Sequence, residues 1–167
     1  KSTALASLGS DATPLYWYTL DESDGDVQHF LAYLIAAFRF HLPGAPGVST
    51  ALLNELGAGA EIPPAQVLDA LINELSDALD APSLLVLDDF QTVATMPAVC
   101  DLVERLIAFA PPDLHIIIST WHPLPFPALV SWRARGETLE IGRADLAFRI
   151  EEIKDFFQRD GELSLSQ

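Results

Sequence analysis

The 167-residue chain is half hydrophobic, which fits one globular domain that buries roughly two-thirds of its unfolded surface. Its 24 acidic and 9 basic residues give a net charge of −15, which argues against direct DNA binding by this segment. No apolar stretch reaches the ~20 residues of a membrane span, and Lys1 does not open a signal peptide. We therefore expect a cytoplasmic protein with no membrane partner, in which the single cysteine, Cys100, is an inert core thiol.

The first half of the chain predicts one strand followed by three helices. Leu15–Leu20 is aromatic and β-favouring and follows a proline, which is typical of a strand. Apolar residues then recur at helical spacing, and the Pro63-Pro64 pair suits the first turn of a helix. The expected helices cover residues 26–40, 49–56 and 64–79.

The second half predicts alternating strands and helices. Ser83–Leu87 is an apolar run without alternation, which indicates a strand covered on both faces of a parallel sheet. Leu114–Ile118 repeats this pattern, whereas Thr138–Ile141 alternates and predicts a shorter strand nearer an edge. The expected helices cover residues 99–107, 128–134 and 150–157.

Strands that alternate with helices predict an α/β fold with right-handed βαβ units and a parallel sheet. No repeat or linker interrupts residues 1–167, so we expect a single domain. Ligands bind at the carboxyl ends of the strands in such sheets. This rule places Asp21, Asp88-Asp89 and Ser119-Thr120 on one functional edge.

Lys1-Ser2-Thr3 matches the end of a phosphate-binding loop, G-x-x-x-x-G-K-[ST]. In that loop backbone N–H groups hold phosphates, the lysine reaches the outer phosphates and the hydroxyl binds Mg²⁺. The glycines of the motif do not precede Lys1, and a lysine before a hydroxyl residue is common by chance. The alternative interpretation is a simple helix start.

Asp88-Asp89 ends the buried strand that precedes Phe90. Two adjacent carboxylates in such a place are costly unless they are solvated, hydrogen-bonded or close to a cation. One could hold Mg²⁺ while the other orients an attacking water. Equally, the pair could cap the turn that follows.

Other candidates carry weaker signals. The four histidines show no zinc-like spacing with one another or with Cys100. No serine lies in a G-x-S-x-G elbow, so serine hydrolase chemistry has no support. Arg133 and Arg135 could neutralise phosphate, but ordinary surface arginines remain the favoured interpretation.

Four ordered blocks of the chain together resemble the ATPase domain of maltose-regulon-activator-type regulators. These are LuxR-type members of the STAND class of P-loop ATPases. The blocks are 16–21 (YWYTLD), 30–37, 84–90 (LLVLDDF) and 116–148. The resemblance implies a three-layer, ASCE-type P-loop NTPase-like sheet with helices on both faces and strand order 5-1-4-3-2. Its central first strand would precede Lys1, so we expect a chain truncated within the phosphate loop.

The resemblance also implies an ATP-controlled switch that oligomerises with ATP bound and rests with ADP, alongside the other domains of a regulator. Lys1 would contact the β- and γ-phosphates, and Thr3 would extend this loop. Ser2 and Asp88 would ligate Mg²⁺. Asp89 would lie near the attacking water, with Ser119 and Thr120 near the γ-phosphate.

Thr120 departs from the family pattern, which often has an arginine after the residue matching Ser119. A neutral threonine cannot supply a cationic contact to the γ-phosphate, so slow hydrolysis is expected. The alternative function is a degenerate, nucleotide-independent scaffold for protein interactions. A metabolic P-loop enzyme has no substrate-site motif to favour it.

Overall fold

The computed structural model describes residues 13–39, 42, 47–142 and 144–147. The chain divides into two compact units, residues 1–129 and 130–167. The single domain expected from the sequence stays a prediction. Among the described helices, none has the length and apolar character needed to cross a membrane.

A three-stranded parallel sheet forms the centre of the first unit. It consists of β1 (Leu15–Thr19), β2 (Ser83–Asp88) and β3 (Leu114–Ile118), in the order β1-β2-β3. Thr19 lies opposite Asp88, and Leu87 lies opposite Ile118, so the three strands end together. The structure confirms the α/β class, the parallel pairing and the order predicted for these three strands.

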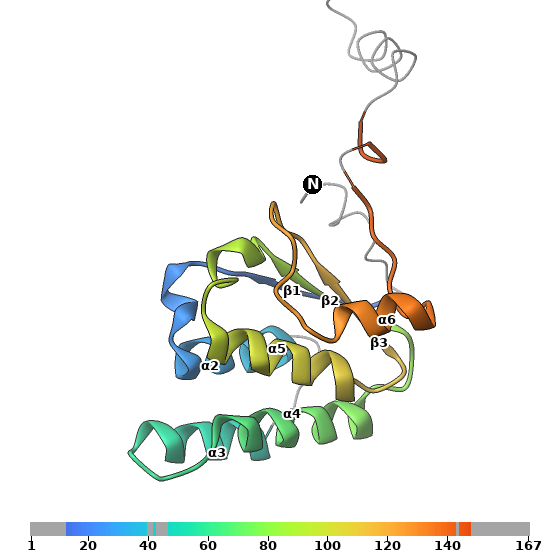
Figure 1. The fold of residues 1–167 in the computed structure, drawn as a ribbon. Helices are drawn as coiled ribbons and strands as arrows, with labels where there is room; N and C mark the ends of the chain where they lie inside the picture. The colour runs from blue at the N-terminus through green and yellow to red at the C-terminus, as the bar shows by residue number, and fades with distance from the viewer. Residues whose placement is uncertain (1–12, 40–41, 43–46, 143, 148–167) are drawn as a thin grey trace, which may run out of the picture. The chain divides into compact units, whose positions relative to one another are not determined.

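Four helices of this unit pack beside the sheet and on one another. They are α2 (Val27–Arg39), α3 (Val48–Gly57), α4 (Pro64–Ala78) and α5 (Pro97–Phe109). Helix α2 packs on β1, and α4 contacts both α2 and α5. In Figure 1, α3 and α4 form a layer beyond α2 and α5. These helices confirm the three expected in the first half and the one expected near residues 99–107.

The core forms where aromatic side chains of β1 meet α2. Tyr16 and Tyr18 point to the same side of the strand and are buried, whereas Trp17 between them is only half-buried. The ring of Tyr16 lies 4.6 Å from that of Phe38, and Tyr18 lies 5.8 Å from Phe30. Burial of such rings contributes much of the apolar stabilisation of a small core. The apolar stripe of α2 thus fixes this helix against one face of the sheet.

Strand β3 is less covered than its apolar sequence predicted. His115 is exposed, and Ile116, Ile117 and Ile118 are only half-buried, whereas β2 is buried along most of its length. The difference follows from position, because β3 is an edge strand among the described residues and β2 is central. The sequence also predicts helices on both faces of the sheet. A helix on the face opposite α2 stays a prediction, because residues 1–12 lie outside the described part of the chain.

Of the elements predicted from the sequence in the second unit, one is confirmed and one is wrong. Helix α6 (Leu129–Arg135) confirms the short helix expected near residues 128–134. The strand expected at Thr138–Ile141 is wrong, because these residues have no strand structure and Leu139 is 87% exposed. A strand needs a backbone partner, and local alternation cannot reveal whether one exists. The helix expected at residues 150–157 lies outside the described residues.

Candidate functional site

The carboxyl ends of the three strands meet at one edge of the sheet. The backbone N–H of Leu20 donates to the carbonyl of Asp88 at 2.9 Å, and that of Ser119 donates to Leu87 at 3.0 Å. The N–H of Phe90 in turn donates to the carbonyl of Ser119 at 3.0 Å. These bonds place the residues after β1, β2 and β3 side by side, as the sequence predicted from strand direction.

Asp88 brings a carboxylate to this edge from the central strand. Asp88 is only 4% exposed. Its Oδ1 accepts a hydrogen bond from the N–H of Asp89 at 3.1 Å. A buried carboxylate is costly unless hydrogen bonds or a cation compensate its lost hydration. Asp88 is therefore held in place in part by the turn that follows it.

Asp89 adopts a left-handed conformation, with φ 57° and ψ 38°, and is the only non-glycine residue with positive φ in the described parts of the chain. It precedes the short helix η2 (Phe90–Thr92), whose backbone N–H groups donate no hydrogen bond to the Asp89 side chain. Instead, Oδ1 of Asp89 accepts from Nε2 of Gln91 at 3.0 Å. Its carboxylate is thus positioned by a side chain and does not cap the turn.

Two buried side-chain oxygens near this turn have no hydrogen-bond partner among the described residues. They are Oε1 of Gln91 and Oγ of Ser119, and Ser119 is 5% exposed. Unsatisfied buried polar atoms are rare in native proteins and call for a physical explanation. Sequence reasoning selected Ser119 but missed Gln91, whose part becomes visible only in its contact with Asp89.

Thr120 lies at the same edge but uses its hydroxyl locally. Oγ1 donates to the carbonyl of His122 at 3.0 Å and accepts from the His122 N–H at 3.2 Å. Such a turn is typical of threonine. Trp121, between them, is 75% exposed. The threonine side chain therefore shapes the loop after β3.

The other residues named from the sequence either lie outside the described residues or have partners of their own. Lys1, Ser2 and Thr3 lie outside the described residues. Asp21 caps the short helix η1 (Glu22–Gly25), where Oδ1 accepts from the N–H of Ser23 at 2.7 Å. In the second unit, Arg133 pairs with Glu140 and Arg135 pairs with Glu137. These pairs satisfy the guanidinium groups, which favours the interpretation of ordinary surface arginines.

Cys100 lies in the core, as expected from the sequence, and its inertness stays a prediction. It is buried, and Sγ donates to the carbonyls of Val93 at 3.6 Å and Ala94 at 3.5 Å. Burial, aided by the charge of Asp101, raises the pKa of the thiol. A thiol with a raised pKa is a poor nucleophile and metal ligand.

The edge of the sheet that carries Asp88 and Asp89 could bind Mg²⁺ together with the phosphates of a ligand. Within the described residues, no group of three or more His, Cys, Asp or Glu side chains could enclose a metal ion. Mg²⁺ normally keeps several waters and binds one or two carboxylates together with substrate phosphates. Asp88 and Asp89 at the strand ends supply two carboxylates of the kind that this donor set uses.

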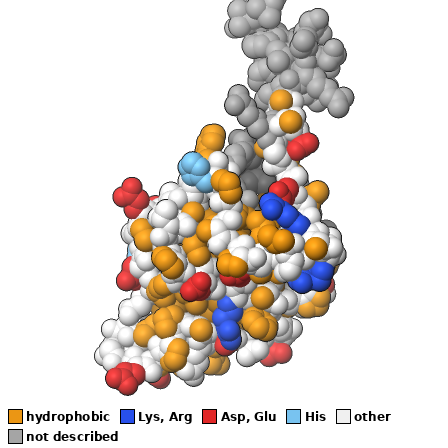
Figure 2. Space-filling view, viewed as in Figure 1, with side chains coloured by type: hydrophobic (Ala, Val, Ile, Leu, Met, Phe, Trp, Pro, Cys, Tyr) orange, Lys and Arg blue, Asp and Glu red, His pale blue; other side chains and the backbone are white. Residues whose placement is uncertain are grey.

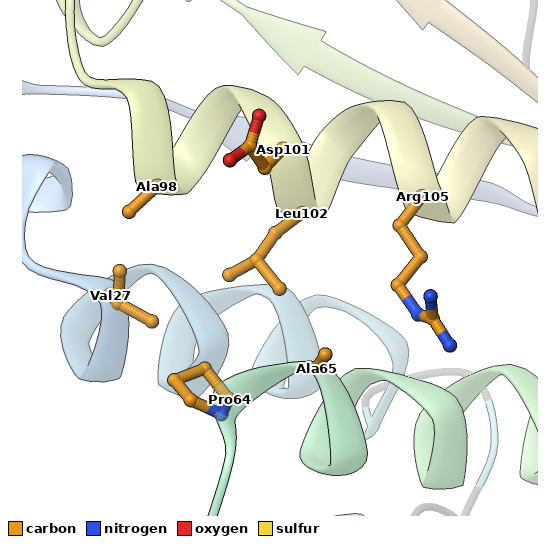
Figure 3. Close-up of a pocket in the computed structure, with 7 residues that line it drawn as sticks. All are labelled: Val27, Pro64, Ala65, Ala98, Asp101, Leu102 and Arg105. Carbon is orange, nitrogen blue, oxygen red and sulfur yellow. The ribbon is translucent and has the colours of Figure 1, made fainter.

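A separate hollow of about 360 Å³ lies between α2, α4 and α5. Figure 3 shows mainly apolar side chains around it, with Asp101 and Arg105 on α5. Arg105 is already engaged, because Nε and Nη2 donate to the carboxylate of Asp69 at 2.6 and 2.7 Å. Ligand sites combine apolar walls with converging polar groups. The hollow offers few of these, so the strand ends remain the candidate site.

Surface charge adds no cationic site on the visible face. In Figure 2, acidic side chains are scattered over this face and the few basic side chains do not gather into one large patch. With a net charge of −15, such a surface opposes binding to a phosphate backbone.

The fold and this edge define an α/β protein with a helix-flanked parallel sheet, consistent with a P-loop NTPase-like fold. No family model matches the chain. The chain is 33% identical over 161 residues to the HTH-type transcriptional regulator MalT of Yersinia pestis (strain Pestoides F), covering 95% of the chain. It is 31% identical over 157 residues to MalT of Yersinia enterocolitica. The match indicates homology, and the chain spans 17% of the length of these relatives.

Proposed function

We propose that the chain is an ATP-binding signal-transduction switch domain of a LuxR/MalT-type bacterial transcriptional regulator. The observation that carries this proposal is the pair Asp88-Asp89 at the end of a buried parallel strand, between Leu87 and Phe90, which are both hydrogen-bonded to Ser119 after β3. Homology to MalT over 95% of the chain supports the same reading. Signalling by nucleotide-controlled oligomerisation, in the cytoplasm, is part of the proposal.

The nucleotide would lie across the carboxyl edge of the sheet. Lys1 and Thr3 would contact its phosphates, and Ser2 with Asp88 would hold Mg²⁺. When bound, Mg²⁺ would neutralise charge that develops on the phosphate oxygens. Asp89 would orient the attacking water, and Ser119 would face the γ-phosphate with its unsatisfied hydroxyl.

Hydrolysis would be slow, because the edge lacks a described cation near Ser119. The following residue is Thr120, whose hydroxyl already bonds His122. An arginine that contacts the γ-phosphate stabilises the charge of the transition state. A slow ATPase suits a switch, since the lifetime of the ATP state then sets the duration of the signal. Partners would be the other domains of the regulator and further copies of the chain.

Calorimetric titration with Mg-ATP tests the proposal on the natural protein that carries this sequence. We expect saturable binding that weakens at least about tenfold in Lys1→Ala, since the lysine contacts the outer phosphates. Asp88→Asn should weaken the Mg²⁺ dependence of binding, whereas Asp77→Asn, at an exposed position on α4, should change neither. An absence of binding by the unmutated protein would refute the proposal and favour the nucleotide-independent scaffold, an alternative that the local use of Thr120 supports.

A further inference from the structure

The hollow between α2, α4 and α5 lies where these three helices begin. Val27 and Pro64 are the first residues of α2 and α4, and Ala98 is the second residue of α5. Figure 3 shows the short side chains of Ala65 and Ala98 on two sides of the hollow. An alanine side chain ends at Cβ, so these positions leave space that longer side chains would fill between packed helices. The volume of about 360 Å³ is that of a small binding pocket.

Helix α5 supplies four of the seven residues that line the hollow. Ala98, Leu102 and Arg105 recur at helical spacing, with Asp101 beside them. At 1.5 Å per residue this stretch is about 10 Å long, or two helical turns. Ala98 and Asp101 are exposed, whereas Leu102 is buried. An open, mainly apolar hollow of this length between helices suits the apolar face of a docked amphipathic helix.

The surroundings of the hollow are acidic. The first unit, residues 1–129, holds 16 of the 24 acidic residues of the chain, against three basic residues, Lys1, Arg39 and Arg105. Arg105 lines the hollow, but both carboxylate oxygens of Asp69 compensate its charge. The carboxylate of Asp101 forms no ion pair with any residue that the structure describes. The hollow thus combines an apolar lining with one uncompensated negative charge.

We propose that this hollow is the docking site of a positively charged amphipathic helix from another domain of the natural protein. Apolar side chains one helical turn apart enter the hollow, and a flanking lysine or arginine pairs with Asp101. The chain spans 17% of the length of its MalT relatives, so a regulator of that size supplies further domains as partners. The inference rests on the proposed place of this chain in a larger regulator and is independent of nucleotide binding.

Charge and chemistry favour this occupant over three others. Two copies of the chain, each with a net charge of −15, repel one another. The same charge opposes a nucleic acid. A small ligand needs converging polar groups, and the lining offers only Asp101, since Arg105 is already engaged. A cationic helix gains from both the apolar lining and the acidic surroundings.

Site-specific photo-cross-linking in the natural protein, without nucleotide, tests the docking. A benzoylphenylalanine in place of Gln66, which is exposed and follows Ala65 on α4, lies beside the hollow without filling it. We expect mass spectrometry to identify a cross-link to a lysine- or arginine-rich helical segment outside residues 1–167. The same probe in place of Asp77, which is exposed on α4 but does not line the hollow, is the control and should not link to that segment.

Two variants separate the apolar and the charged parts of the site. Ala98→Trp fills the hollow and should abolish the cross-link, whereas Asp101→Lys should lower its yield at least about fivefold because like charges meet. Asp77→Asn should leave the yield unchanged. Both variant positions are exposed, and unchanged melting temperatures would show that the fold is kept.

Four results would overturn the docking proposal. They are the absence of a cross-link, a link to a second copy, a link to a segment that is acidic or within residues 1–167, and a yield that Ala98→Trp and Asp101→Lys leave unchanged. Because the measurement uses no nucleotide, each of these results leaves the proposed ATP binding intact. Failure of the natural protein to bind Mg-ATP would in turn leave the cross-link unaffected.

Discussion

Glu74 of α4 caps the start of α3 from 25 to 27 residues away in sequence. Its Oε1 accepts from the N–H groups of Gly47 and Val48 at 2.6 and 2.5 Å, and Oε2 accepts from Ser49 Oγ at 2.6 Å. The N–H of Ser49 adds a longer bond of 3.2 Å. The residue before α3 is Gly47, which has no side chain to cap the helix. One carboxylate therefore satisfies N–H groups that the helix itself cannot pair.

Replacing Glu74 should cost stability in proportion to these contacts. Loss of an N-cap acceptor costs about 1–2 kcal/mol, and a negative charge near a helix N-terminus adds about 0.3–1 kcal/mol. Glu74 is half-buried, so solvent screens part of its charge. We expect Glu74→Ala to lower the free energy of unfolding by about 2 kcal/mol. Glu74→Gln, which keeps one acceptor oxygen, should cost about 1 kcal/mol.

The effect should depend on pH in a defined direction. Burial alone would raise the pKa of Glu74, but the bonds from Ser49, Val48 and Gly47 outweigh it and lower the pKa below the ordinary 4.5. A carboxyl with a depressed folded-state pKa contributes stability above its unfolded pKa and loses it as the pH falls through the folded value. The difference between wild type and Glu74→Gln should therefore be full at neutral pH and shrink below about pH 4.5.

Urea unfolding followed by circular dichroism measures these free energies, and hydrogen exchange of the α3 amides reports the local effect. Asp77→Asn is the control, because Asp77 is exposed on the same helix. The reasoning is refuted if Glu74→Ala stays within about 0.5 kcal/mol of the wild type, the usual range for neutral surface changes. It is also refuted if the loss in Glu74→Gln is the same at all pH values.

Two further predictions concern buried groups. Tyr18→Phe removes the hydroxyl that donates to buried Asp24 at 2.5 Å, and should cost about 1–3 kcal/mol in urea unfolding because that carboxylate loses a donor. Burial and the hydrogen bond to Asp24 raise the pKa of Tyr18 above 10.0. The wild type should therefore lose this increment of stability as the pH rises above about 10, whereas Tyr18→Phe should not. An equal decline in both proteins would contradict the assignment. Burial also raises the pKa of Cys100, so a disulfide reagent should label the native protein far more slowly than the urea-unfolded protein. Equal labelling rates would show that the thiol is accessible.

The parts of the fold that were predictable are those whose signal is local. The apolar run Ser83–Leu87 correctly predicted the central strand, and the helical spacing of apolar residues in Val27–Arg39 correctly predicted the helix that covers β1. Thr138–Ile141 failed because four alternating residues fit a strand only if a partner strand is present. The sequence also gave no sign that β3 would be more exposed than β2, since exposure depends on position within the sheet.

In the candidate site, too, features set by local sequence and strand direction were predicted, and features set by contacts between distant residues were not. Strand direction alone predicted that Asp88 and Ser119 would share an edge, because carboxyl ends of parallel strands meet there. No pattern marked Gln91, since a glutamine after a strand is unremarkable until its amide is seen on a carboxylate. The Glu74 cap was equally hidden, because the contact joins residues at least 25 positions apart.

The conformation of Asp89 bears on the choice that the sequence left open, between a turn cap and a ligand-facing carboxylate. A cap would show its carboxylate accepting backbone N–H groups of η2, and no such bond is present. The N–H of Thr92 goes to the Asp89 carbonyl, as in an ordinary turn, so the turn closes without the side chain. A left-handed aspartate costs of order 1 kcal/mol. Since the turn closes without the Asp89 carboxylate, which accepts a hydrogen bond only from the Gln91 side chain among the described residues, the geometry favours the ligand-facing alternative over a backbone cap.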